Sequence, residues 1–261
     1  MGEWDAALYS RFERERTRPA ADLLAQVGSD PPATVFDLGC GPGNSTELLA
    51  RRFPNAVVTG IDTSEGMLTA ARERLPACRF EPADIATWRP SEPADLLFAN
   101  ASLQWVPEHE ILIPRLLGML APGGTLAVQV PDNWGEPSHS LMRAAAAEQP
   151  WAAFINASSP RPRLLSPQRY YDLLASNGAS VTLWRTIYHH PIVSAAAIVD
   201  WVRATGLRPY LDGLPAQHRP GFVARYQAMI DAAYAVRADG MRLLAFPRLF
   251  LVATLPPLKG A

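Results

Sequence analysis

Residues Val35 to Thr46 read VFDLGCGPGNST and form the segment of this chain best suited to chemistry. An apolar run ends at Asp37, and glycines follow at positions 39, 41 and 43 before a helix-like segment begins. Glycine permits unusual backbone dihedrals and lets a ligand approach the main chain closely. A sharp turn at a strand end also leaves backbone N–H groups and a helix N-terminus open to a ligand. We therefore expect a nucleotide-type pocket at this turn.

Asp37 indicates which nucleotide-type ligand suits the turn. The dinucleotide fingerprint is G-x-G-x-x-G, whereas the spacing here is G-x-G-x-G, with a carboxylate two residues before the first glycine. A carboxylate repels a pyrophosphate, but it attracts a ligand that carries an ammonium and a sulfonium group. The pattern disfavours a dinucleotide and favours S-adenosylmethionine.

Three later strand ends also offer polar groups. The run AVVTGID ends at Asp62, 23 residues after Gly39, where a carboxylate can accept both ribose hydroxyl protons. Asp84 follows a short strand and could accept a hydrogen bond from an adenine amino group, with Ile85 as an apolar wall. The next strand end carries Asn100, Gln104 and Trp105. Ligands of open parallel sheets bind at such strand ends, although each acid taken alone could simply cap a helix.

In order along the chain, the segments VFDLGCGPGNST, GIDTSEGML, PADIATW and LAPGGTLAVQV resemble the motifs of the class I S-adenosylmethionine-dependent methyltransferases. Within that class the chain is most similar to the trans-aconitate 2-methyltransferase subfamily. This similarity lies in WDAALYSRFERERTRPAADLL, NASLQWV, VRATGLRPYLDGL and FPRLFLVATL. The resemblance implies an enzyme that uses S-adenosylmethionine, releases S-adenosylhomocysteine and esterifies one carboxylate of trans-aconitate or a similar small polycarboxylate.

The resemblance also implies cofactor roles at the matching positions. Asp37 and the glycines would line the methionine portion, Asp62 would hold the ribose, and Asp84 would flank the adenine. The expected cofactor set is Arg16, Asp37, Gly39, Gly41, Gly43, Asn44, Asp62, Thr63, Met67, Asp84, Ile85, Asn100 and Gln104. Met67 could equally be an ordinary apolar helix residue, and Arg16 a solvated helix charge.

A carboxylate acceptor would need no general base, because it is already ionised at neutral pH, with an unperturbed pKa near ~4. We therefore expect no catalytic acid or base and no metal. The protein would instead align the reacting atoms and exclude water. Arginine suits bidentate carboxylate binding, although a solvated surface role is open for each one. The expected substrate set is Trp105, Arg163, Tyr188, Arg208, Tyr210 and Arg248. The adjacent pair His189-His190 cannot share one metal from a regular strand, because neighbouring strand residues point to opposite faces.

Strand and helix patterns alternate along the first half of the chain, which predicts an α/β fold with a doubly wound sheet. Strand patterns fall at 34–38, 56–61, 78–82, 94–99, 124–130 and 180–189, with a last strand at PRLFLVATL. We expect a Rossmann-like, mostly parallel seven-stranded sheet with the last strand antiparallel and a helical substrate lid. In one methyltransferase domain, 1–261, the core would take about 30–130, 178–190 and 245–255. The cap would take about 1–28, 131–177 and 191–240.

Composition limits the possible partners. Among 261 residues, 48% are hydrophobic and 19% charged, and the formal net charge is −1. A nucleic-acid partner is not expected, because sequence-independent phosphate binding needs clustered excess Lys and Arg. Two cysteines without disulfide or zinc spacing, no transmembrane run and no signal peptide favour the cytoplasm. Oligomeric state stays open. So do a different small or carrier-linked acceptor, a dinucleotide oxidoreductase and a non-catalytic S-adenosylmethionine-binding protein.

Overall fold

The first half of the chain alternates helices and strands, as the sequence predicts. The computed structural model describes residues 13–258 apart from 29, 156–161 and 204. Its elements up to residue 131 are α2 (Glu13–Leu24), β1 (Thr34–Leu38), α3 (Asn44–Arg52), β2 (Val57–Asp62), α4 (Glu65–Arg74), β3 (Arg79–Pro82), β4 (Ala94–Asn100), η1 (Leu103–Trp105), α5 (His109–Leu117) and β5 (Leu120–Pro131).

The second half begins with helices and contains two long strands. Its elements are α6 (Pro137–Ala146), η2 (Trp151–Ala153), α7 (Pro167–Ser176), β6 (Ser180–Ile192), α8 (Ala195–Arg203), α9 (Arg208–Asp212), η3 (Ala216–His218), α10 (Arg219–Ala233) and β7 (Arg242–Thr254). The Ser166 side chain caps α7 by accepting from the Arg169 N–H, and Pro167 occupies the first turn. Proline suits that position because its missing N–H would have no helical partner there.

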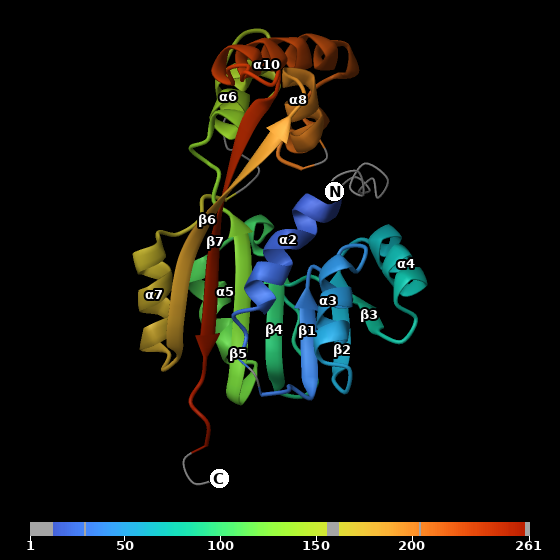
Figure 1. The fold of residues 1–261 in the computed structure, drawn as a ribbon, viewed down its shortest axis with the longest axis vertical. Helices are drawn as coiled ribbons and strands as arrows, with labels where there is room; N and C mark the ends of the chain where they lie inside the picture. Colours follow the sequence, from blue (N-terminus) through green and yellow to red (C-terminus); the bar gives the residue numbers. More distant parts are fainter. Residues whose placement is uncertain (1–12, 29, 156–161, 204, 259–261) are drawn as a thin grey trace. The chain divides into compact units, whose positions relative to one another are not determined.

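In the part of the chain that the structure describes, seven strands form one sheet in the order β3-β2-β1-β4-β5-β7-β6. The pairs β2–β3, β1–β2, β1–β4 and β4–β5 are parallel, and one strand is antiparallel, which Figure 1 shows to be β7. The order reverses beside β1, since β2 and β4 lie on its two sides. Such a switch point opens a crevice at the carboxyl ends of the strands. The expected Rossmann-like class is confirmed.

The chain divides into two compact units. Of the described residues, unit 1 holds those within 1–130, 164–185 and 249–261, and unit 2 holds those within 131–163 and 186–248. In unit 1, α2 and α3 lie in front of the strands and α5 lies behind them (Figure 1). In unit 2, α10 packs against α6 and α8. Thus α2 and α7, which the sequence assigned to a cap, belong to the unit that contains most of the sheet.

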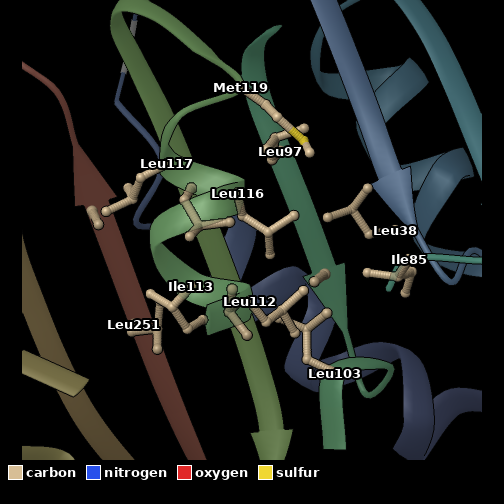
Figure 2. Packing of buried hydrophobic residues seen from close by; sticks show 14 of the residues in the cluster. Leu38, Ile85, Leu97, Leu103, Leu112, Ile113, Leu116, Leu117, Met119 and Leu251 are labelled. Carbon is tan, nitrogen blue, oxygen red and sulfur yellow. The ribbon is translucent and has the colours of Figure 1, made fainter. Parts of the chain in front are cut away.

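The core of unit 1 lies between the sheet and α5. Leu112 and Leu116 of α5 are almost completely buried and belong to one cluster with Leu38 of β1 and Leu97 of β4 (Figure 2). Burial of each such leucine contributes about 1.5–3 kcal/mol. This packing fixes the strand ends from which the site residues extend. Within the described residues, no helix combines the length and the apolar character that a membrane span requires.

Candidate cofactor-binding site

The glycine turn after β1 has the backbone conformation that its sequence predicts. Gly39 and Gly41 have φ angles of 75° and 54°, which L side chains rarely adopt. A Cβ on Gly39 would lie 2.4 Å from Cβ of Ser102, so only glycine fits there. A Cβ on Gly41 would meet nothing within 4 Å, which leaves open space over the backbone. The third glycine, Gly43, precedes α3 with φ 88°.

A cavity of about 360 Å³ opens beside this turn in unit 1. Its volume lies in the range of small-molecule sites, about 300–1,000 Å³. The lining residues come from the ends of β1, β2, β3 and β4 and from the segments that follow these strands. They are Gly39, Gly41, Pro42, Asp62, Thr63, Met67, Ala83, Asp84, Ile85, Ala86, Ala101, Ser102, Trp105, Val106 and Pro107. Eight of the predicted site residues therefore meet around one cavity.

Asp62 at the end of β2 is held in place by two backbone donors. Its Oδ2 accepts from the Gly41 N–H at 2.9 Å, and its Oδ1 accepts from the Ser64 N–H at 2.9 Å. A carboxylate has about four lone-pair sites, so it can also accept from a pair of hydroxyl groups. The geometry suits the expected ribose contact.

The part of the cavity formed after β3 has an acid and apolar walls. Asp84 is exposed and lines the cavity, and its Oδ1 accepts from the Ala86 N–H at 2.8 Å. Ile85 and Met67 line the same cavity and are buried, at 8% and 4% exposure. Met67 is therefore both a buried apolar residue of α4 and a part of the cavity wall.

Asp37 is completely buried next to the turn. Its Oδ2 accepts from Ser45 Oγ and Thr46 Oγ1, each at 2.7 Å, and its Oδ1 has no hydrogen-bond partner in the described part of the chain. Burial raises the pKa of this carboxyl to about 6, against the lowering effect of the two hydroxyl donors and with a smaller raising effect from Asp62. The buried oxygen would be stabilised by a cation.

A second, small cavity of about 40 Å³ lies on the other side of the glycine turn, against α2. Its lining includes Thr17, Asn44, Ser45 and Asn100. Thr17 Oγ1 and Asn100 Oδ1 are buried without hydrogen-bond partners among the described residues. With Asp37 behind Ser45, this cavity offers mainly acceptor oxygens. An ammonium group can donate hydrogen bonds to these acceptor oxygens. A pyrophosphate cannot, because it offers only acceptors and negative charge.

The remaining predicted cofactor residues lie elsewhere. Gly43 is not among the lining residues, and a Cβ there would come within 3.4 Å of Ala71, so its role is close packing of α4. Gln104 is buried, and its Nε2 donates to the Ala101 carbonyl at 2.6 Å. It therefore shapes the turn after β4 and does not line either cavity. The Arg16 side chain lies outside the described residues.

The predicted substrate residues are divided between the two units. Trp105 lines the large cavity of unit 1, while the other five lie in unit 2. There, Arg248 and Tyr188 are both buried to 4% exposure. They connect through aromatic rings: the Arg248 guanidinium lies 4.9 Å from the Phe246 ring, which contacts His190, which stacks on Tyr188.

The other three substrate candidates have different surroundings. Tyr210 stacks on Phe222 of α10, and Arg208 pairs with Asp212 one helical turn later, at 3.4 Å. Arg163 is exposed. Tyr188 and His190 share one face of β6, while His189 on the other face is exposed. This alternation agrees with the argument against a shared metal.

The sequence did not predict several residues that shape the site. Ser102 lines the large cavity, and its Oγ is buried without a hydrogen-bond partner within the described residues. His109 of α5 lies with Nε2 2.8 Å from the Leu103 carbonyl and Nδ1 2.5 Å from the Tyr170 hydroxyl. Burial lowers the pKa of His109. The hydrogen bonds from Ser45 and Thr46 to Asp37 were also not predicted, although these two hydroxyl residues follow the glycine turn closely in the sequence.

Solved structures confirm the fold at low sequence identity. The YcgJ protein from Bacillus subtilis has a TM-score of 0.60 and 12% identity, over 92% of this chain and 99% of that chain. The cyclase SpnF has a TM-score of 0.52 and 19% identity, over 92% of this chain and 82% of that chain. Because a cyclase shares the fold, the fold does not define the reaction.

Sequence comparisons are more specific. Residues 35–124 match the family described as "Methyltransferase domain". Relatives named trans-aconitate 2-methyltransferase from Methylobacterium radiotolerans, Variovorax paradoxus and Paracidovorax citrulli are 60%, 61% and 62% identical to this chain. Each match covers 97% of this chain and 98% of the relative. The chain therefore belongs to the trans-aconitate 2-methyltransferase family of S-adenosylmethionine-dependent methyltransferases.

Proposed function

We propose that this protein transfers a methyl group from S-adenosylmethionine to one carboxylate oxygen of trans-aconitate. The observation that carries the proposal is the extent of the similarity. Relatives named for this reaction match 97% of the chain, so the similarity extends through unit 2 and not only through the nucleotide-type pocket. A different acceptor would require different side chains in the parts of the chain that surround it.

Residues of unit 1 would hold the cofactor. Asp62 would bind the ribose hydroxyls, Asp84 and Ile85 the adenine, and Asn100 and Thr17 the amino-acid end. The acceptor-rich small cavity and the buried Oδ1 of Asp37 support this orientation. When bound, S-adenosylmethionine supplies an electrophilic methyl group on a positively charged sulfur.

The remaining chemistry would depend on positioning. A carboxylate with a pKa near ~4 needs no deprotonation at neutral pH, so no side chain has to act as general base. Holding the acceptor oxygen in line is worth roughly 7–11 kcal/mol in effective concentration. Trp105 at the cavity wall would help exclude water from the acceptor.

Arg248 is the arginine best placed to bind a substrate carboxylate. It is buried, and the Phe246 ring beneath its guanidinium restricts the plane of its five donors. A restricted guanidinium can form a bidentate pair with a carboxylate at little entropic cost. Tyr188 would add a hydroxyl donor from the same unit. Arg208 and Arg163 are weaker candidates because the first pairs with Asp212 and the second is exposed.

We further propose a cytoplasmic location and no nucleic-acid or membrane partner. Both cysteines, Cys40 and Cys78, are free, which suits a reducing compartment. The net charge of −1 gives no excess of positive charge for phosphate backbones.

The test is a comparison of acceptors at equal concentration. The pure protein is incubated with methyl-labelled S-adenosylmethionine and, separately, with trans-aconitate, cis-aconitate, citrate, isocitrate and a malonyl-carrier conjugate. We expect kcat/KM for trans-aconitate to exceed the others by at least about tenfold. Preferential transfer to another acceptor would replace the substrate assignment. Tight cofactor binding without any transfer would favour a non-catalytic binding protein.

A further inference from the structure

Arg115, on α5, contacts the segment that forms the adenine end of the large cavity. Its guanidinium donates to the Ile85 carbonyl through Nη2 and to the Trp88 carbonyl through Nη1, the latter at 2.8 Å. Ile85 lines the cavity, but Arg115 does not. The arginine therefore acts on the cavity from behind, through the backbone of one of its walls.

The segment Asp84–Trp88 is a single helical turn. The Trp88 N–H donates to the Asp84 carbonyl at 2.8 Å, and the Asp84 side chain accepts from the Ala86 N–H at 2.8 Å. A single isolated turn is unstable, because its nucleation fixes several dihedrals for one hydrogen bond. Its last carbonyls also lack helical partners, and a cation there satisfies them.

Two other contacts fix the ends of this turn against the core. Trp88 packs edge-on against Phe36 of β1, with ring centroids 4.9 Å apart. Ile85 belongs to the same buried cluster as Leu112 and Leu116, which lie on the same helix as Arg115 (Figure 2). Apolar packing thus fixes the height of the turn, whereas the guanidinium fixes the direction of its carbonyls.

The orientation of the turn determines where the Asp84 carboxylate lies. This carboxylate is exposed in the cavity, where its Oδ1 accepts from the Ala86 N–H and its charge interacts with the Arg115 guanidinium. If the turn rotates or frays, the carboxylate moves with it. The hydrogen bond between this carboxylate and a ligand atom then becomes weaker, and so does the discrimination between ligands that differ at that atom.

We propose that Arg115 is a positioning residue for adenine recognition, and that the preference of this site for a 6-amino purine depends on its fork between the Ile85 and Trp88 carbonyls. This inference rests on the proposed S-adenosylmethionine site and adds a specificity determinant to it. It predicts that Arg115 affects the choice of base more than the overall affinity for the cofactor.

The experiment compares two ligands by calorimetry: S-adenosylhomocysteine and S-inosylhomocysteine, in which an oxo group replaces the 6-amino group. In the wild type, the carboxylate of Asp84 would accept from the amino group and repel the oxo group. We expect a preference for the adenine ligand of roughly 10- to 100-fold. In Arg115→Met, which keeps an apolar stem of similar length but lacks the guanidinium, we expect this preference to fall to about threefold or less.

Arg169→Met is the matched control. Arg169 lies on α7 and pairs with Glu110 of α5, with both groups about half exposed, but it contacts neither cavity. We expect it to keep the wild-type preference. If Arg115→Met does not fold, Arg115→Lys provides the same test. A lysine keeps the charge but cannot span both carbonyls in the planar geometry of a guanidinium, so an intermediate preference is expected.

Three results would overturn the inference. Equal weakening of both ligands in the Arg115 variant would assign it a general structural role. An unchanged preference in the foldable variant would exclude any part in recognition. If the wild type bound S-adenosylhomocysteine and S-inosylhomocysteine equally well, the inference would also be refuted, while the proposed function would stay intact. Failure of the wild type to bind S-adenosylhomocysteine at all would refute the proposed function itself.

Discussion

Asp37→Asn should stabilise the ligand-free protein while weakening its cofactor site. The structure raises the pKa of the buried carboxyl from 3.8 to about 6, chiefly through burial. A difference of about two units corresponds to about 3 kcal/mol, at 1.36 kcal/mol per unit. Asparagine is neutral at every pH, so the variant does not carry this cost.

The sign of the pH dependence follows from which state holds the proton more tightly. The folded pKa of Asp37 is above the unfolded value, so between pH 3.8 and about 6 the folded state binds more protons. The free energy of unfolding of the wild type therefore falls as pH rises through this window, and the cost is complete above about pH 6. The amide of the variant places a donor where Oδ1 lies, and this adds an offset that does not change with pH.

The assay is urea unfolding of the ligand-free wild type and Asp37→Asn at pH 4, 5, 6 and 7. We expect the difference in unfolding free energy, variant minus wild type, to increase by up to about 3 kcal/mol from pH 4 to pH 7. Asp172→Asn, at an exposed position of α7, serves as control and should stay within about 0.5 kcal/mol at every pH. A flat difference for Asp37→Asn would refute the reasoning, because it would mean that the buried carboxylate costs nothing.

Two further predictions concern the turn and the substrate arginine. Gly39→Ala places a Cβ 2.4 Å from Cβ of Ser102 at φ 75°. It should cost about 1–3 kcal/mol of stability and abolish S-adenosylhomocysteine binding by calorimetry, whereas Gly118→Ala, at φ −67°, should keep both. Arg248→Lys should raise KM for trans-aconitate at least about tenfold through loss of bidentate contact and leave the cofactor Kd unchanged. Arg51→Lys, at an exposed position of α3, should alter neither KM for trans-aconitate nor the cofactor Kd. A normal KM in Arg248→Lys would remove Arg248 from the substrate site.

The strands and helices of unit 1 were predictable where local sequence signals agree with the fold. The run TVFDL is followed directly by a glycine turn, so the strand at 34–38 has the predicted bounds. Similarly, Ser166 and Pro167 define the start of α7. The prediction was less accurate for β5, which the sequence pattern placed at 124–130. The strand instead begins at Leu120, with a register shift in its pairing to β4.

The position of Asp62 and Asp84 was predictable, because both follow strand ends and such residues gather at one edge of a parallel sheet, where they line the large cavity. The site was not predictable where tertiary contacts decide. Gln104 is turned toward the Ala101 carbonyl, and Arg115 reaches carbonyls 27 and 30 residues earlier in the chain. Neither contact has a local sequence signal. Burial of Asp37 is likewise a property of the assembled sheet, so its raised pKa required the structure.

The most direct test of the account follows a ¹³C-labelled methyl group by NMR. Wild-type protein is incubated with trans-aconitate and methyl-labelled S-adenosylmethionine between pH 6 and pH 9, and the labelled product is identified. The account predicts a single O-methyl ester on one carboxylate. It also predicts a rate that is constant above pH 7, because no side chain has to remove a proton from the acceptor. A carbon-bound label, or a rate that rises tenfold per pH unit, would contradict the account.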